Sequence, residues 1–225
     1  GVRIVVDSGV ERRQRFDPAT GMSRLETVRI SRSSADQRRG RAGRTAPGTC
    51  YRLWSESAHD SLLPQAPAEI LEADLAPLAL ELACWGCNDP AALTWIDPPP
   101  PAPLAQARDL LARLEAVDSG GRVTPLGRDM AALGLHPRLA HMVLRGRDLG
   151  LERLACWIAA LLSERDPLRA GPGFRDSDLA HRIEVLHGRA APPGMDVDSG
   201  AVRRIHRVIQ QVERQLVRTR TSRAP

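Results

Sequence analysis

The chain has 225 residues, of which 42% are hydrophobic, and this is enough for one or two domains with hydrophobic cores. No apolar run approaches the ~20 residues that cross a bilayer, and no signal peptide opens the chain, so we expect neither a membrane protein nor a secreted one. All 32 basic residues are arginine. Because a P-loop needs a lysine to reach the phosphates of a nucleotide, this sequence contains no P-loop.

The net charge of +5 hides a strong segregation of charge along the chain. Residues 1–52 contain 12 arginines and 5 acidic residues, residues 53–200 contain 13 and 21, and residues 201–225 contain 7 and 1. A polyanion is therefore expected to meet the two basic ends rather than the acidic middle.

The first sixty residues have the pattern of a small α/β unit. Four stretches have the apolar or alternating character of strands: residues 2–6, 13–16, 25–30 and 49–53. A turn rich in Pro, Thr and Gly at 17–21 joins the middle two strands into a hairpin. Ser34 or Ala35 is expected to open a helix that carries a cluster of arginines. We interpret residues 1–60 as the closing part of an α/β motor domain.

The middle of the chain has the pattern of a winged helix. Four stretches predict helices: residues 75–85, 90–95, 104–116 and 126–133. Residues 118–121 form a glycine-containing turn into a short strand at 122–124, and this order is typical of a winged helix. The proline run at 98–101 is expected to be a stiff connector. We place this domain at residues 61–137.

The last part of the chain, residues 138–225, is expected to be entirely helical. The predicted helices are 138–149, 152–163, 177–187 and 201–218, with loops rich in Gly and Pro at 166–175 and 189–200.

Residues 37–44 read QRRGRAGR, with four arginines in eight positions. The small residues between them would let the backbone approach a ligand: Gly40, Ala42 and Gly43. Arg41 and Arg44 are three positions apart and would fall on one side of a helical turn. Two converging guanidinium groups suit phosphoryl transfer, where planar donors meet the charge on phosphate oxygens. From these residues alone, a basic loop that binds RNA or DNA is the alternative.

Other clusters give weaker indications. Cys84 and Cys87 form a CxxC pair, but no second close pair of cysteines completes a zinc site. His136 and His141 are five apart, which is not the spacing of two ligands on one helical face. We predict no metal site: the thiols are expected to be buried or half-buried in a reducing cytosol, and the histidines to cap helices or lie at the surface.

The arginine motif resembles motif VI of the DEAH-box helicases, Q-R-x-G-R-x-G-R, at every fixed position. Five other segments resemble the same family: residues 5–9 (VVDSG), 16–22 (FDPATGM), 47–53 (PGTCYRL), 97–100 (DPPP) and 124–128 (TPLGR). The resemblance runs through most of the chain and points to the bacterial HrpB-type helicases.

The resemblance implies a fragment of an ATP-dependent helicase that couples ATP hydrolysis to movement along a single strand. The implied fold class is an α/β fragment followed by mostly α structure. Its parts would be the end of a second RecA-like domain (1–60), a winged helix (61–137) and the start of a helical bundle, the ratchet domain (138–225).

The resemblance also implies roles for the residues of the motif. Arg41 and Arg44 would be arginine fingers for ATP, and Gln37 would contact the γ-phosphate or position the attacking water. Arg38 and Gly40 would complete the nucleotide-binding set, although Arg38 could instead brace two motor domains. The P-loop and the ligands of Mg²⁺ would lie in a preceding RecA-like domain of the same protein, so the fragment alone is expected to be inactive.

The expected polymer is single-stranded RNA, with DNA less favoured, and the expected location is cytoplasmic. One Tyr and two Phe provide no aromatic platform for bases, so contact would run through arginine to phosphates without sequence preference. Arg203, Arg204 and Arg207 are the candidates, although the solvated face of an amphipathic helix explains them equally well. The alternative function, a winged-helix regulator with a basic N-terminal arm, leaves Gln37 and the glycine spacing unexplained.

Overall fold

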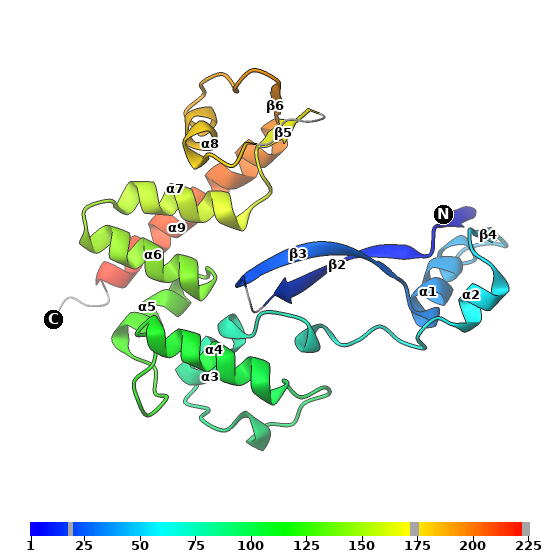
Figure 1. Ribbon diagram of the computed structural model, residues 1–225, viewed down its shortest axis with the longest axis horizontal. Coiled ribbons are helices and arrows are strands. Elements are labelled where there is room, and N and C mark those ends of the chain that lie inside the picture. The colour runs from blue at the N-terminus through cyan, green and yellow to red at the C-terminus, as the bar shows by residue number, and fades with distance from the viewer. Residues whose placement is uncertain (18–19, 172–175, 222–225) are drawn as a thin grey trace. The chain divides into compact units, whose positions relative to one another are not determined.

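The computed structural model describes residues 1–17, 20–171 and 176–221, in which small sheets come first and helices follow (Figure 1). The elements in chain order are β1 (Ile4–Asp7), β2 (Val10–Asp17), β3 (Met22–Arg29), α1 (Arg32–Ala42), β4 (Thr49–Arg52), α2 (Glu56–Asp60), η1 (Glu69–Leu71), α3 (Ala76–Cys84), η2 (Pro90–Ala92), α4 (Pro101–Arg113), α5 (Pro125–Ala132), α6 (Pro137–Asp148), α7 (Glu152–Ser163), β5 (Leu168–Ala170), α8 (Leu179–Leu186), β6 (Met195–Val197) and α9 (Ser199–Thr221). The predicted fold class, α/β structure followed by mostly α structure, is confirmed.

The chain divides into two compact units. The first unit contains residues 1–75 and 93–105, and the second contains residues 76–92 and 106–225.

The first unit contains a parallel strand pair, β1 and β4, in which Ile4 lies opposite Thr49. Helix α1 packs on one face of this pair, and Asp7 at the end of β1 is buried. Ile4, Val6 and Tyr51 alternate with the residues of that face and are each more than half exposed. This face of the pair is therefore apolar and uncovered, whereas parallel strands are normally covered on both faces.

Strands β2 and β3 form an antiparallel hairpin in which Gln14 lies opposite Leu25. Both strands are longer than predicted. Most of the additional positions are polar or charged, so hydrophobic alternation in the sequence does not reveal them. Ion pairs such as Arg15–Glu26, at 3.6 Å across the strands, stabilise this pairing. Residues 18–19 of the predicted turn lie outside the described residues.

Helix α1 begins at Arg32, so the predicted start at Ser34 or Ala35 is wrong. Ser31 has an extended backbone (φ −84°, ψ 166°), and its Oγ accepts the N–H of Ser34 at 3.1 Å. A serine in this geometry satisfies a backbone donor of the first turn, so the helix starts directly after it.

Two predictions around the proline run are also wrong. The helix predicted at 90–95 is only the 3₁₀ turn η2, and α4 begins at Pro101, inside the predicted connector at 98–101. The N–H groups of the first helical turn have no partner within the helix, so a proline, which has no N–H, is tolerated there. The last proline of the run can therefore be the first residue of α4.

In the second unit, Thr124 fixes the turn between α4 and α5. Its Oγ accepts the N–H of Gly127 at 3.0 Å and donates to the carbonyl of Glu115 at 2.6 Å. A Cβ on Gly127 would lie 2.1 Å from the carbonyl oxygen of Ala116, so only glycine fits there. The cap and the close approach together explain why the helix starts with the sequence T-P-L-G.

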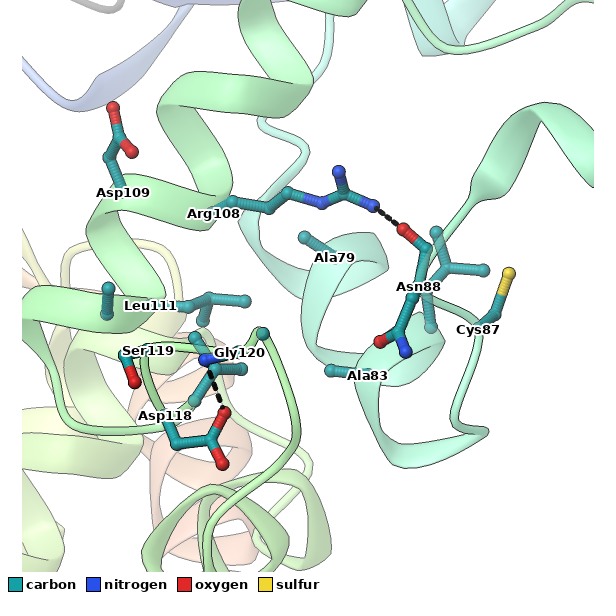
Figure 2. Close-up of a pocket in the computed structure, with 14 residues that line it drawn as sticks. Ala79, Ala83, Cys87, Asn88, Arg108, Asp109, Leu111, Asp118, Ser119 and Gly120 are labelled. Carbon is teal, nitrogen blue, oxygen red and sulfur yellow. Dashed lines mark hydrogen bonds between the residues drawn. The ribbon is translucent and has the colours of Figure 1, made fainter.

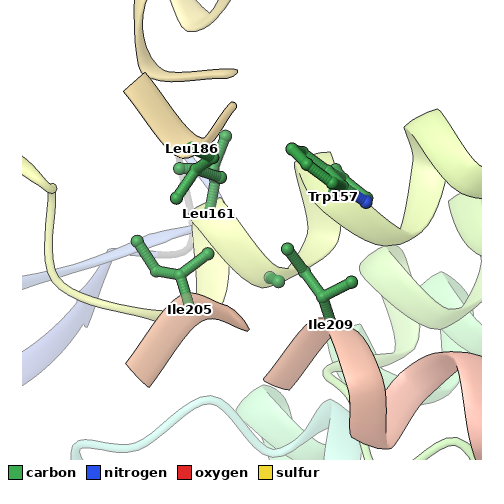
Figure 3. Close-up of a cluster of buried hydrophobic side chains, with 6 residues drawn as sticks. Trp157, Leu161, Leu186, Ile205 and Ile209 are labelled. Atoms are coloured by element: carbon green, nitrogen blue, oxygen red, sulfur yellow. The ribbon is translucent and has the colours of Figure 1, made fainter. Parts of the chain in front are cut away.

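Side chains of α7, α8 and α9 meet in one hydrophobic core (Figure 3). Its buried members are Trp157, Ala160, Leu161, Leu186, Ile205 and Ile209. The ring of His187 stacks on Trp157 with 4.4 Å between the ring centroids. This core holds α9 against α7, and residues on the opposite side of α9, such as Arg203 and Arg207, are exposed.

The prediction of entirely helical structure after residue 138 is wrong in one place. Strands β5 and β6 form a short antiparallel pair in which Leu168 lies opposite Val197. Leu168 and Met195 are buried with Val185 of α8. Each strand has only three residues, which is too short for alternation to be recognised in the sequence.

The side chain of Arg182 on α8 ties this region together. It is 9% exposed, and its Nη2 donates to Asp166 Oδ2 at 2.8 Å and to the carbonyl of Asp176 at 2.6 Å. The neighbouring His181 ring lies 2.7 Å from Asp176 Oδ2. This hydrogen bond to the carboxylate raises the pKa of His181.

The raised pKa predicts a pH dependence of stability. His181 contributes stability that is fully present below about pH 6.5 and is lost as the pH rises through its folded-state pKa. The stability difference between wild type and His181→Gln should therefore be constant below about pH 6.5 and shrink as the pH rises above it, as measured by urea unfolding at a series of pH values.

His141 provides the control of opposite sign. Burial lowers its pKa, so its contribution is lost as the pH falls. If the stability of wild type and that of His181→Gln depended on pH in the same way, the stabilising role of protonated His181 would be contradicted.

Candidate functional site

Helix α1 carries the arginine motif and is anchored at its N-terminal end. Its first residues Arg32 and Ser33 donate their N–H groups to the carbonyls of Leu63 and Pro64 at 2.8 and 3.1 Å. Ala35 is fully buried in a cluster of the first unit with Ile30 and Leu62. The N-terminal end is therefore used by the fold itself, and the C-terminal half of the helix presents the motif.

One arginine of the motif points inward. Arg38 Nη1 lies 2.9 Å from Oδ1 of Asp7, whose side chain is 1% exposed, and it also donates to the carbonyl of Val10 at 3.2 Å. The same Asp7 oxygen accepts the N–H of Gly9 at 3.0 Å. Arg38 therefore neutralises a buried carboxylate at the end of β1 and holds α1 against that strand.

Three other residues of the motif point outward. Gln37 and Arg41 are exposed and lie one turn apart on α1, and Arg44 is exposed after the helix. Within the part of the chain that the structure describes, none of the three makes a hydrogen bond or an ion pair. An amide and two guanidinium groups are thus free to bind an external group.

The predicted pairing of Arg41 and Arg44 by helical spacing is wrong. The helix ends at Ala42, and Gly43 is its C-cap, so Arg44 belongs to the following loop. The orientation of Arg44 is therefore set by the loop rather than by the helix.

The neighbouring cations are already paired. Asp36 lies 2.8 Å from Arg52 and 3.6 Å from Arg39. The hydrogen bond from Arg52 lowers the pKa of Asp36. Arg39 and Arg52 therefore both pair with Asp36 of α1, whereas Arg41 and Arg44 have no such partner among the described residues.

Of the three small residues of the motif, Ala42 is buried in the fold, whereas Gly40 and Gly43 face open space. A Cβ on Gly40 or Gly43 would meet nothing within 4 Å, whereas a Cβ on Gly48 would lie 2.2 Å from the carbonyl oxygen of Ala42. The close backbone approach is therefore between the chain's own loop and the buried Ala42. Gly40 and Gly43 keep the outer surface of the motif bare.

Sequence reasoning missed two residues that shape this site, Asp7 and Gly48. Asp7 follows three apolar positions of a strand, and a carboxylate in that place is a signal for a buried partner. Gly48 stands directly before a strand, but its contact depends on where α1 ends and has no signal in the sequence.

The arginines predicted to bind nucleic acid lie on α9. Arg203 and Arg207 are exposed, and Arg204 is half-buried with its Nε 3.5 Å from Glu164. The structure therefore brings two of the three to one open side of the helix.

The two histidines singled out in the sequence contact other groups of α6, the helix on which His141 lies. His136 caps α6 by accepting the N–H of Arg138 at 3.2 Å, and His141 lies 3.4 Å from Arg145. Burial raises the pKa of the Cys84 thiol and that of Cys156, the latter to about 11. Across the described ranges, no group of three or more His, Cys, Asp or Glu could hold a metal ion.

A cavity of about 300 Å³ opens between α3, α4 and the turn at 117–121 (Figure 2). Arg108 donates across it to the carbonyl of Asn88 at 2.8 Å, and Asp118 accepts the N–H of Gly120 at 2.9 Å. These polar groups bind each other, so the cavity offers less for ligand chemistry than α1 does.

None of the described helices has the length and apolar character that a membrane crossing requires.

Comparison with known proteins identifies relatives of this chain. The family model described as helicase associated domain (HA2), winged-helix, matches residues 107–135, which include the Thr124 cap and α5. The ATP-dependent RNA helicase HrpB of Escherichia coli K12 is 44% identical over 179 residues, which are 80% of this chain and 21% of that protein. The Schizosaccharomyces pombe pre-mRNA-splicing factor ATP-dependent RNA helicase prp22 is 40% identical over 72% of this chain and 14% of that protein.

A solved structure of an HrpB helicase is also similar to this chain. The crystal structure of the Escherichia coli DEAH/RHA helicase HrpB matches with a TM-score of 0.76 and 38% identity, over 100% of this chain and 25% of that one. The chain thus spans only 21% and 14% of the length of these two curated relatives.

The contacts of Gly48 predict a strong response to one methyl group. Gly48→Ala should destabilise the first unit by about 2 kcal/mol or more, because its Cβ would collide with backbone that cannot move away. Gly43→Ala is the matched control, and it should change stability by no more than about 1 kcal/mol since its Cβ enters open space. Hydrogen exchange of the α1 amides measures both, and equal effects would show that the close approach is wrong.

Proposed function

Because the chain belongs to the DEAH-box helicases of the HrpB type, we propose that it is part of an ATP-dependent RNA helicase and supplies arginine fingers to its ATP site. The observation that carries this proposal is that one residue of the motif is paired within the protein and three are not. Arg38 is bound to Asp7, whereas Gln37, Arg41 and Arg44 are exposed and unpaired among the described residues.

The free side chains have the chemistry that phosphoryl transfer needs. During transfer of the γ-phosphoryl group, negative charge spreads over its oxygens, and guanidinium groups placed against them stabilise that charge. In this proposal Arg41 and Arg44 supply the guanidinium groups. Gln37, one turn from Arg41, binds the γ-phosphate or positions the attacking water. The bare surface at Gly40 leaves room for the nucleotide beside them.

Arg38 takes a different part in the nucleotide site. Its pairing with Asp7 supports a positioning role, in which it holds α1 so that Gln37 and Arg41 face the nucleotide. The alternative, that Arg38 itself contacts ATP or a second motor domain, requires it to leave a buried carboxylate.

ATP supplies the phosphoryl group when it is bound, and Mg²⁺ would accompany it. The sequence contains no lysine, so the P-loop lysine would come from a further RecA-like domain of the same protein, together with the ligands of Mg²⁺. In this account the 225-residue chain hydrolyses no ATP by itself.

The domain assignment is part of the proposal. Residues 1–60 would close the second RecA-like domain, and the uncovered apolar face of β1 and β4 supports a place in a larger α/β domain whose other elements cover that face. Residues 61–137 would form the winged helix, which contains the matched segment 107–135. Residues 138–225 would begin the helical ratchet domain that helps to couple hydrolysis to strand movement.

We propose single-stranded RNA as the polymer and the cytoplasm as the location. The RNA helicase names of the relatives and the free arginines of α9 support this choice. A winged-helix regulator would share residues 107–135 but would have no use for unpaired Gln37, Arg41 and Arg44.

The arginine fingers can be tested in the complete enzyme that contains this chain. Arg41→Ala and Arg44→Ala should each lower the rate of ATP hydrolysis roughly 10³-fold, while ATP affinity changes much less because the contact strengthens in the transition state. Phosphate release and nucleotide binding measure the two effects.

Arg39→Ala is the matched control, since it removes the same charge from the same helix at a residue that pairs with Asp36. It should keep nearly wild-type turnover. If Arg41→Ala or Arg44→Ala behaved like Arg39→Ala, that residue would not be an arginine finger.

A further inference from the structure

The loop between α1 and β4, residues 43–48, carries Arg44, so the contacts of this loop decide where that guanidinium group lies. Both ends of the loop are fixed by the fold. Ala42, the last residue of α1, is buried, and Thr49, the first residue of β4, is paired with β1. The direction of Arg44 therefore depends on what holds the residues between these two ends.

Arg3, which directly precedes β1, holds this loop with its backbone and with its side chain. Its carbonyl accepts the N–H of Thr49 at 2.9 Å. Its side chain reaches two residues further back, where Nε donates to the carbonyl of Pro47 at 3.2 Å. A Cβ on Gly48, between these two contacts, would lie 2.7 Å from the carbonyl oxygen of Arg3, so the loop passes directly beside this residue.

The bond from Arg3 to Pro47 has no substitute in the loop. Within the part of the chain that the structure describes, no other hydrogen bond or ion pair involves residues 44–47. At the other end of the loop, a Cβ on Gly43 would meet nothing within 4 Å, so packing does not hold the chain there either. The side chain of Arg3 is therefore the polar anchor of the segment that contains Arg44.

The chemistry of proline extends the effect of this anchor toward Arg44. Pro47 has a fixed φ, and its ring disfavours the helical conformation for Ala46. An anchor on the Pro47 carbonyl therefore limits the conformations of both residues, and Arg44 lies only two positions before Ala46.

We infer that Arg3 is a positioning residue for Arg44. By binding the Pro47 carbonyl, its guanidinium group holds the loop in the conformation that directs Arg44 to the γ-phosphate. The inference rests on the proposed role of Arg44 as an arginine finger. It also distinguishes the two fingers, because Arg41 lies on α1, which the ion pair of Arg38 holds against β1.

The test is a double-mutant cycle in the complete enzyme. Arg3→Ala should lower kcat for ATP hydrolysis about tenfold and leave KM nearly unchanged, because losing one hydrogen bond loosens the loop without removing a group that binds ATP. In the Arg44→Ala background the same change should cost nothing further, since no finger remains to be positioned. In the background of the control Arg39→Ala, the tenfold loss should remain.

Two further measurements separate positioning from a general loss of structure. Arg3→Lys keeps a donor for a single carbonyl and should recover most of the lost kcat. Arg3→Ala should also weaken binding of ADP with aluminium fluoride, a mimic of the transition state, about tenfold and leave the affinity for ADP unchanged, because the finger acts in the transition state.

Three results would overturn the inference: wild-type kcat in Arg3→Ala, a rise in KM with kcat unchanged, or the full tenfold loss in the Arg44→Ala background. The last two are the results expected if Arg3 itself contacts ATP. Wild-type turnover in Arg44→Ala would instead reject the arginine finger, so the failure of this inference and the failure of the proposed function are distinguishable.

Discussion

The ion pair between Arg38 and the buried Asp7 is the contact on which the arrangement of the arginine motif depends. A carboxylate that is 1% exposed needs a cation, and Arg38 reaches it from one side of α1 at 2.9 Å. The pair holds α1 against β1, and Gln37 and Arg41 of the same helix remain exposed. Arg38 therefore belongs to the fold, whereas Arg41 has no partner among the described residues and stays free for a ligand.

The same division between paired and free arginines describes the second unit. Arg182 is buried among carboxyl and carbonyl groups and joins α8 to the segment before β5, so it serves the structure. Arg203 and Arg207 lie on the open side of α9 and serve no contact within the described chain. Because every basic residue here is arginine, residue type alone does not separate these roles, and only the partner of each guanidinium group does.

Much of the fold could be predicted from the sequence, because long helices such as α7 have a clear apolar period and the arginine motif resembles a known family. The roles of Asp7 and Gly48 could not be predicted in the same way, since their partners lie 31 and 6 positions away and meet them only through the path of the fold. Strands β5 and β6 are too short to leave a periodic signal. The contact between Arg204 and Glu164, 3.5 Å apart, likewise joins residues 40 positions apart and has no signal in the sequence.

The measurement that tests the central claim most directly compares stability and turnover for Arg38→Gln and Arg41→Gln in the complete enzyme, with Asp7→Asn completing a double-mutant cycle for Arg38. The account predicts that Arg38→Gln destabilises the first unit by about 3 kcal/mol and that much of this loss disappears when Asp7 is also replaced, because the buried charge is then absent. It predicts that Arg41→Gln keeps wild-type stability and loses ATP hydrolysis. Wild-type stability of Arg38→Gln, or unfolding caused by Arg41→Gln with turnover intact, would contradict the division between structural and free arginines.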